Sequence, residues 1–166
     1  LACLYAAEYM SKEGAEDRFF MFYLIAFGVT LGIAFSGNIL TMYFFYELLT
    51  LSTLPLVIQP MTTGSRRAGR YYLLYSIGGA AFAFIGMVFL LTYGSGAEFA
   101  MGGILTAEAW ENRTLMLIVY VGAFMGFGVK AAIFPLHSWL PKASVAPTPV
   151  TALLHAVAVV KAGAFA

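Results

Sequence analysis

The chain has 166 residues, of which 61% are hydrophobic and only 10% are charged, and its formal net charge is +1. A soluble domain is typically about 45–50% apolar and about 25% charged, so this composition is typical of a membrane protein. The near-neutral charge gives no support for binding to nucleic acid. A single cysteine, Cys3, excludes an internal disulfide and a cysteine-based metal cluster. Because the sequence lacks an initial Met and stops inside an apolar run, we expect it to be part of a longer protein.

Five stretches of the chain are apolar enough to cross a bilayer, which takes about 20 residues of helix. Lipid cannot satisfy backbone polar groups, so these stretches should be helices. The sequence therefore predicts an all-α, polytopic transmembrane bundle that forms a single membrane domain. We expect residues 1–10 to end a preceding helix, and the spans to lie at about 19–37, 39–59, 71–93, 115–136 and 150–166.

Basic residues are unevenly distributed between the loops that join these spans. The loops at 11–18, 60–70 and 137–148 fall on one side of the membrane, and the opposite side carries only Arg113. Short cytoplasmic loops are enriched in Lys and Arg, so we expect the first side to be cytoplasmic. Its six basic residues are Lys12, Arg18, Arg66, Arg67, Arg70 and Lys142.

Four ionisable residues lie at membrane depth: Glu47, Lys130, His155 and Lys161. A charge at the centre of a membrane helix costs about 2.5–3.5 kcal/mol on insertion scales, so such residues are functional candidates by default. Burial disfavours the charged form of a lysine and a nearby carboxylate favours it, so these residue types are suited to moving protons. The alternative is that the charges only tie helices together.

Lys130 lies in a segment that predicts a discontinuous helix. Pro135 removes a helical hydrogen bond to the Ala131 carbonyl, and we expect Gly126 and Gly128 to loosen the helix on the other side. Broken helices at mid-membrane are how transporters build ion sites. The alternative is that Lys130 extends toward the cytoplasmic headgroups.

The two histidines have less specific surroundings. His155 precedes Lys161 by six positions, which in an ideal helix is about 9 Å of rise and 120° of rotation, so we expect water rather than a direct bond to join them. His137 lies in the bend "PLHSWLP" beside Trp139, which we expect to be interfacial, and the alternative for His137 is a structural role. The histidines are 18 positions apart on different elements, and nucleotide and CxxC motifs are missing, so we expect no metal and no cofactor.

Three segments resemble the antiporter-like membrane subunits of respiratory complex I, a family that includes Mrp-type cation/proton antiporters and energy-converting membrane hydrogenases. They are "GVKAAIFPLHSWLPKASVAPTPVTALLHAVAVVKAGAF", "SGNILTMYFFYELLTLSTLPLVI" and "AGRYYLLYSIGGAAFAFIGMVFL". The resemblance covers roughly residues 5–166, and the phrases "YELLTLSTLPLVIQ" and "VTALLHAVAVVKAG" favour the Mrp-like subunits.

The resemblance implies about fourteen helices with two inverted five-helix repeats, of which this chain would supply helices four to eight and the end of helix three. It implies that Glu47 is the intramembrane glutamate, Lys130 its partner lysine, and Lys161 the helix-eight residue that passes protons onward. His155 and His137 fall at histidine positions of the family. Helix seven, which would contain Lys130, is discontinuous in the family.

We therefore expect a proton-translocating subunit, with Na⁺ as an alternative or exchanged ion, in a complex I-like or Mrp-like assembly. The expected partners are other membrane subunits and the lipid of a bacterial or archaeal cell membrane. Such a chain performs no redox chemistry, because the partner complex supplies the driving force. The alternatives are a scaffold subunit whose charges only tie helices, a quinone-binding membrane oxidoreductase subunit, and a small-solute transporter.

Overall fold

The helices of this protein follow one another in antiparallel passes. The computed structural model describes residues 2–166, in which no β-strand occurs. The elements are α1 (Ala2–Glu13), α2 (Glu16–Ala34), α3 (Ile39–Val57), α4 (Thr63–Tyr93), α5 (Glu108–Glu111), α6 (Arg113–Lys130), the 3-10 turn η1 (Leu136–Ser138), α7 (Trp139–Ala143), α8 (Thr148–Ala152), the π-helical turn η2 (Leu153–Val157) and α9 (Val159–Phe165).

Five helical segments are long and apolar enough to cross a membrane, which confirms the all-α polytopic fold. They are α2, α3, α4, α6 and the run from Thr148 to Phe165. Two bounds differ from the expected spans by more than three residues. Helix α4 begins at Thr63 because the Thr62 hydroxyl accepts a hydrogen bond from the Ser65 amide (3.1 Å) and caps the helix. Helix α6 ends at Lys130 rather than near residue 136.

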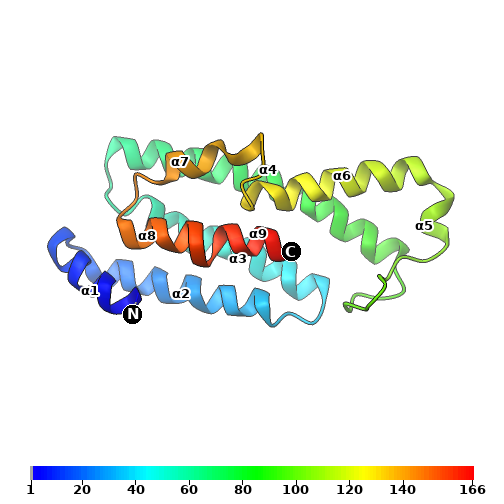
Figure 1. Ribbon diagram of the computed structural model, residues 1–166, viewed down its shortest axis with the longest axis horizontal. Helices are drawn as coiled ribbons and strands as arrows, with labels where there is room; N and C mark the ends of the chain where they lie inside the picture. The colour runs from blue at the N-terminus through cyan, green and yellow to red at the C-terminus, as the bar shows by residue number, and fades with distance from the viewer. Residues whose placement is uncertain (1) are drawn as a thin grey trace.

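The spans pack side by side along the long axis of the molecule (Figure 1). Helix α4 packs against both α3 and α6, α2 covers the other flank of α3, and α9 lies against α6. The connections at 14–15, 58–62 and 144–147 lie together at one end of the bundle, and residues 35–38 and 94–112 lie at the other (Figure 1). At the first end, Arg18 donates to the Gln59 side chain (3.1 Å) and backbone (2.8 Å), which fixes α2 against α3.

Helices α4 and α6 approach closely because each has a glycine at the crossing. A Cβ added to Gly79 would lie 2.7 Å from the Gly126 carbonyl oxygen, and one added to Gly126 would lie 2.6 Å from the Gly79 carbonyl oxygen. Small residues permit this approach between membrane helices. Helix α6 is continuous through Gly126 and uses this glycine for packing, so a loosening of the helix there stays a prediction.

The break after α6 is confirmed, and its end is held by a tryptophan. Ala132 adopts a left-handed conformation (φ 55°) and turns the chain out of the helix before Pro135. Trp139 Nε1 donates a hydrogen bond of 2.7 Å to the Val129 carbonyl oxygen, and its ring packs on that of Tyr72, with centroids 5.3 Å apart. The expectation of an interfacial Trp139 is therefore wrong, since its side chain is 1% exposed.

We predict that Gly79→Ala destabilises the protein by about 1–3 kcal/mol, the usual cost of inserting a methyl group where the backbone must shift. Gly78→Ala on the same helix is the matched control, because a Cβ there meets nothing within 4 Å. Denaturant unfolding of both variants in detergent measures the difference. Equal stability of the two variants would contradict the close approach of α4 and α6.

The grouping of the three basic loops at one end yields a prediction of orientation. In a Cys3→Ala background, Val145→Cys should react with a membrane-impermeant maleimide only from the cytoplasmic side. Met101→Cys, exposed in the loop at the other end, should react only from the opposite side. Labelling of right-side-out and inverted vesicles measures both. A reversed pattern would overturn the cytoplasmic assignment.

Candidate functional site

Lys130 is the last residue of α6 and its side chain is 1% exposed. Its ammonium nitrogen donates a hydrogen bond to the backbone carbonyl oxygen of Tyr46 on α3. The same nitrogen lies 3.4 Å from the centroid of the Tyr46 ring. The side chain is thus directed toward α3, inside the bundle, and does not extend toward the headgroups.

Glu47 follows Tyr46 on α3 and is half-buried. Its Oε1 atom is buried and accepts no hydrogen bond, so the Lys130 ammonium is bonded to the neighbouring backbone rather than to this oxygen. Tyr46 Oη and Thr50 Oγ1 are likewise buried without a partner. Leaving a buried polar group unsatisfied costs about 1–3 kcal/mol, and such groups commonly mark functional sites. All three atoms lie within residues 46–50 of α3, the stretch that begins at the Lys130 contact.

Other hydroxyl groups extend this polar region across α3 and α4. Thr53 Oγ1 and Tyr72 Oη are 2.7 Å apart, and both residues are fully buried. Ser52 and Thr53 also donate to the Leu49 carbonyl oxygen, at 3.1 and 2.6 Å. Buried polar side chains therefore continue from Lys130 toward the Trp139 anchor.

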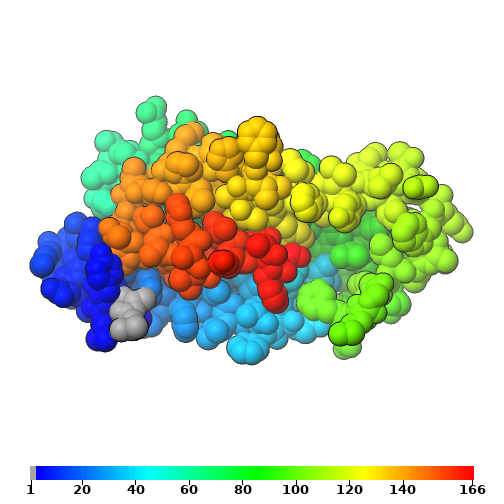
Figure 2. All heavy atoms as spheres, in the orientation of Figure 1, coloured from blue at the N-terminus to red at the C-terminus, as the bar shows by residue number. Residues whose placement is uncertain are grey.

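The structure does not bring His155 and Lys161 into contact with this cluster. Both are exposed, and His155 Nε2 lies 3.2 Å from Ser144 Oγ. The π-helical turn η2 contains His155, so the ideal-helix rotation between the two residues does not apply. Helix α9 nevertheless crosses the end of α6, since a Cβ added to Gly163 would lie 2.9 Å from Lys130 Cβ. Figure 2 shows α9 (red) at the surface of the bundle.

His137 lies apart from the cluster, in the exposed turn η1. Its ring stacks on that of Phe134, with centroids 5.8 Å apart and an interplanar angle of 26°. The next residue, Ser138, donates to Tyr75 Oη at 2.7 Å. These contacts hold the turn that carries His137 just after the break in α6.

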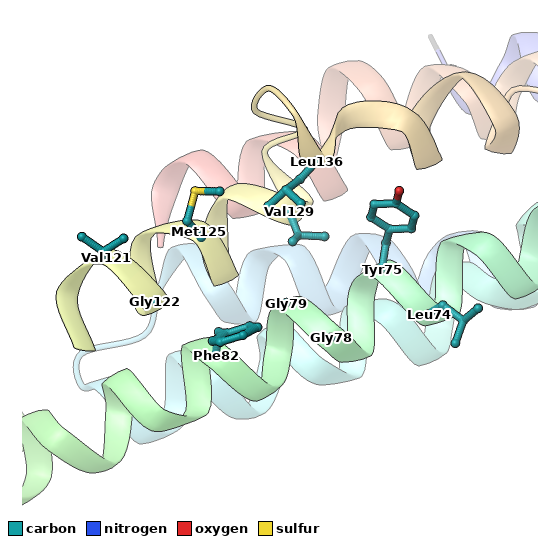
Figure 3. A pocket seen from close by; sticks show the side chains of 10 residues that line it. All are labelled: Leu74, Tyr75, Gly78, Gly79, Phe82, Val121, Gly122, Met125, Val129 and Leu136. Atoms are coloured by element: carbon teal, nitrogen blue, oxygen red, sulfur yellow. The ribbon is translucent and has the colours of Figure 1, made fainter. Parts of the chain in front are cut away.

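An apolar groove of about 540 Å³ lies on the other side of the α6 terminus. Figure 3 shows Phe82 and Tyr75 on the α4 side of this groove, and Met125 and Val129 on the α6 side. Val129 lines this groove while the next residue, Lys130, contacts α3. Apart from the Tyr75 hydroxyl its lining side chains are apolar, so the groove offers no path for a charge.

Sequence reasoning did not single out Tyr46, Tyr72 or Trp139 as site residues, although they surround the Lys130 end of α6. Aromatic residues are abundant in this chain, at 16% of the total, so their identity alone is a weak signal. The position of Tyr46 directly before the intramembrane Glu47 was the one available indication.

Comparison with known proteins identifies the family. A family model described as "NADH:quinone oxidoreductase/Mrp antiporter, TM" matches residues 36–166, a range that contains all five candidate residues. A protein of Rhizobium meliloti described as part of a probable K⁺/H⁺ antiporter is 35% identical over 170 residues, which cover 99% of this chain and 16% of that protein. A Na⁺/H⁺ antiporter component of Alkalihalophilus pseudofirmus is 33% identical over 171 residues, covering 99% and 21%. The chain thus spans less than a quarter of the length of these relatives.

Two solved structures have a similar fold. One is a membrane-bound sulfane sulfur reductase, described as an archaeal respiratory membrane complex, with a TM-score of 0.73 and 26% identity over 90% of this chain and 30% of that one. The other is the Mrp complex from Dietzia sp. DQ12-45-1b, with a TM-score of 0.70 and 17% identity over 98% and 31%, which is a likeness of fold alone. With its five apolar helices, the chain is an integral protein of the cell membrane and belongs to the NADH:quinone oxidoreductase/Mrp antiporter family.

Proposed function

We propose that this chain is part of a membrane subunit that translocates protons, with Na⁺ as an alternative or exchanged cation, in a complex I-like or Mrp-like assembly. One observation carries the proposal: a lysine with 1% exposure lies at the end of a broken membrane helix, beside a glutamate that is not hydrogen-bonded at Oε1. The names of the relatives, which describe Na⁺/H⁺ and K⁺/H⁺ antiporters, support the same class of activity. Other membrane subunits are the proposed partners.

In this proposal Lys130 is the central proton carrier. Its buried ammonium is costly in a medium without water, so loss of the proton is favoured whenever the surrounding negative charge weakens. The negative charge comes from Glu47, which directly follows the residue that Lys130 contacts, Tyr46. The unpartnered oxygens of Glu47 and Thr50 are suited to holding water that connects Glu47 with Lys130.

Lys161 and His155 carry the proton onward in this proposal. Helix α9 crosses α6 at Lys130 and carries the exposed Lys161, and the preceding turn η2 carries the exposed His155. A further segment or another protein of the assembly can therefore reach both residues. His137, on the turn after the break, is assigned to the entry of the path. An exposed lysine at membrane depth is costly in lipid, which supports a protein or water-filled surrounding for it.

The second candidate function, a scaffold, is favoured by a specific contact. Lys130 joins α6 to α3 through the Tyr46 carbonyl and ring, so the lysine also ties two helices together. A scaffold role predicts that removal of the charge harms assembly and leaves transport per assembled complex intact. Measuring assembly and transport on the same samples separates the two functions.

We predict that Lys130→Ala and Glu47→Ala each reduce proton transport by at least about 100-fold per assembled complex, since positioned proton donors and acceptors typically contribute about 10²–10⁴ in rate. Transport is measured in vesicles that contain the full-length protein with its partner subunits. Lys142→Ala and Glu98→Ala, exposed residues of the same types, are the matched controls and should leave transport unchanged. Persistent transport in assembled Lys130→Ala protein would favour the scaffold.

A second prediction distinguishes a carried proton from a fixed charge at Lys161. Arginine keeps the positive charge but does not release its proton in proteins. We therefore expect Lys161→Arg to lose transport as severely as Lys161→Ala does, with assembly intact in the arginine variant. Restoration of transport by arginine would show that only the charge matters and would remove Lys161 from the relay.

A further inference from the structure

We propose that the ring of Tyr46 is a holding site for the protonated Lys130 side chain, which makes Tyr46 a positioning residue for transport. The proposal rests on the proposed function of Lys130 as a proton carrier. It assigns the aromatic face a role that is separate from that of Glu47: the ring binds the ammonium while the carboxylate stays available.

The contact between the two side chains has the geometry of a cation–π interaction. Lys130 Nζ lies 3.4 Å from the centroid of the Tyr46 ring, well within the roughly 6 Å limit for such contacts. The backbone carbonyl of the same residue accepts a hydrogen bond from this ammonium. One residue thus holds the cation with both its main chain and its side chain. Both residues are almost fully buried, and a cation–π contact is stronger when it is desolvated.

The ring is fixed in place by aromatic neighbours on both helices. The ring of Phe127, which lies one turn before Lys130 on α6, meets the Tyr46 ring edge-on with centroids 5.2 Å apart. On α3 itself the Tyr43 ring lies 6.4 Å away, nearly parallel. A ring held from two sides keeps its face toward the ammonium, so the holding site is preorganised by packing.

Two electron-rich groups on consecutive residues of α3 therefore compete for one ammonium. Glu47 Oε1 accepts no hydrogen bond, although Lys130 contacts the residue immediately before it. A buried ion pair between the lysine and the carboxylate would be a strong attraction in a low dielectric. The Tyr46 ring binds the cation without contributing a full negative charge, so it keeps the ammonium close to Glu47 while leaving its proton available.

The chemical character of the holding site predicts a dependence on protonation. The ring face attracts the ammonium but not a neutral amine, because the attraction is electrostatic. Loss of the proton therefore releases the lysine from Tyr46, and return of the proton draws it back. A ring that only filled space would have no such preference.

The test is to vary the electron density of the ring at constant shape. In the full-length protein assembled with its partner subunits, Tyr46 is replaced by phenylalanine and then by mono-, di- and trifluorophenylalanine through nonsense suppression. Each fluorine withdraws electron density from the ring face, whereas the ring volume changes little. We expect Tyr46→Phe to keep most of the proton transport per assembled complex, and transport to fall with each fluorine, to roughly a tenth for the trifluoro ring.

The control is the same fluorinated series at Phe44, which is on the same helix and is exposed. Transport should be flat across that series. Near-complete loss in Tyr46→Phe, or a flat response to fluorine at position 46, would overturn the holding site. If Lys130→Ala abolishes transport in the same assay while the series is flat, the positioning role fails and the proposed function stands. If Lys130→Ala itself transports normally, the proposed function fails.

Discussion

An ammonium group at membrane depth must find its polar contacts within the protein, and the arrangement around Lys130 follows from that constraint. Lipid offers nothing to hydrogen-bond, and leaving a buried charge unpaired costs several kcal/mol. The chain meets the requirement with α3, whose Tyr46 supplies a carbonyl oxygen and a ring face. Helix α6 can present its terminal lysine there because it ends at that residue.

The break in α6 creates a second requirement, since a helix terminus exposes carbonyl groups that must also be satisfied. Trp139 meets it by donating to the Val129 carbonyl oxygen from the start of α7. Because Trp139 packs on Tyr72, and Tyr72 is 2.7 Å from Thr53 by its hydroxyl, the terminus is joined to both α4 and α3. The lysine contacts α3 directly, and the carbonyl before it is linked to α4 and α3 through Trp139 and Tyr72, so a movement of α3 acts on both.

Hydropathy and proline were sufficient to predict the spans and the break, because both depend on local sequence. The five apolar runs needed only their length, and Pro135 indicated where the fourth could not continue. Contacts between helices were not predictable in this way. Only its place directly before Glu47 distinguishes Tyr46 from other tyrosines. Nothing in the sequence distinguishes a buried Trp139 from an interfacial one, since that depends on which residues of other helices lie opposite. The π-helical turn at His155 likewise changes the rotation between His155 and Lys161 from the value that an ideal helix would give. The transport roles of the five candidate residues remain predictions.

The length of α4 has a consequence for the depth of the lysine in the membrane. Its 31 residues extend to about 46 Å, which exceeds the roughly 30 Å hydrocarbon thickness of a bilayer. The first turns carry Arg66, Arg67 and Arg70, which resist entry into lipid, so hydrophobic matching positions the remaining apolar part. Gly79 and Gly126 fix α6 against α4, so the depth at which α4 sits in the membrane also sets the depth of Lys130. The arginines at the start of α4, which stay at the water interface, therefore position a lysine that lies on another helix.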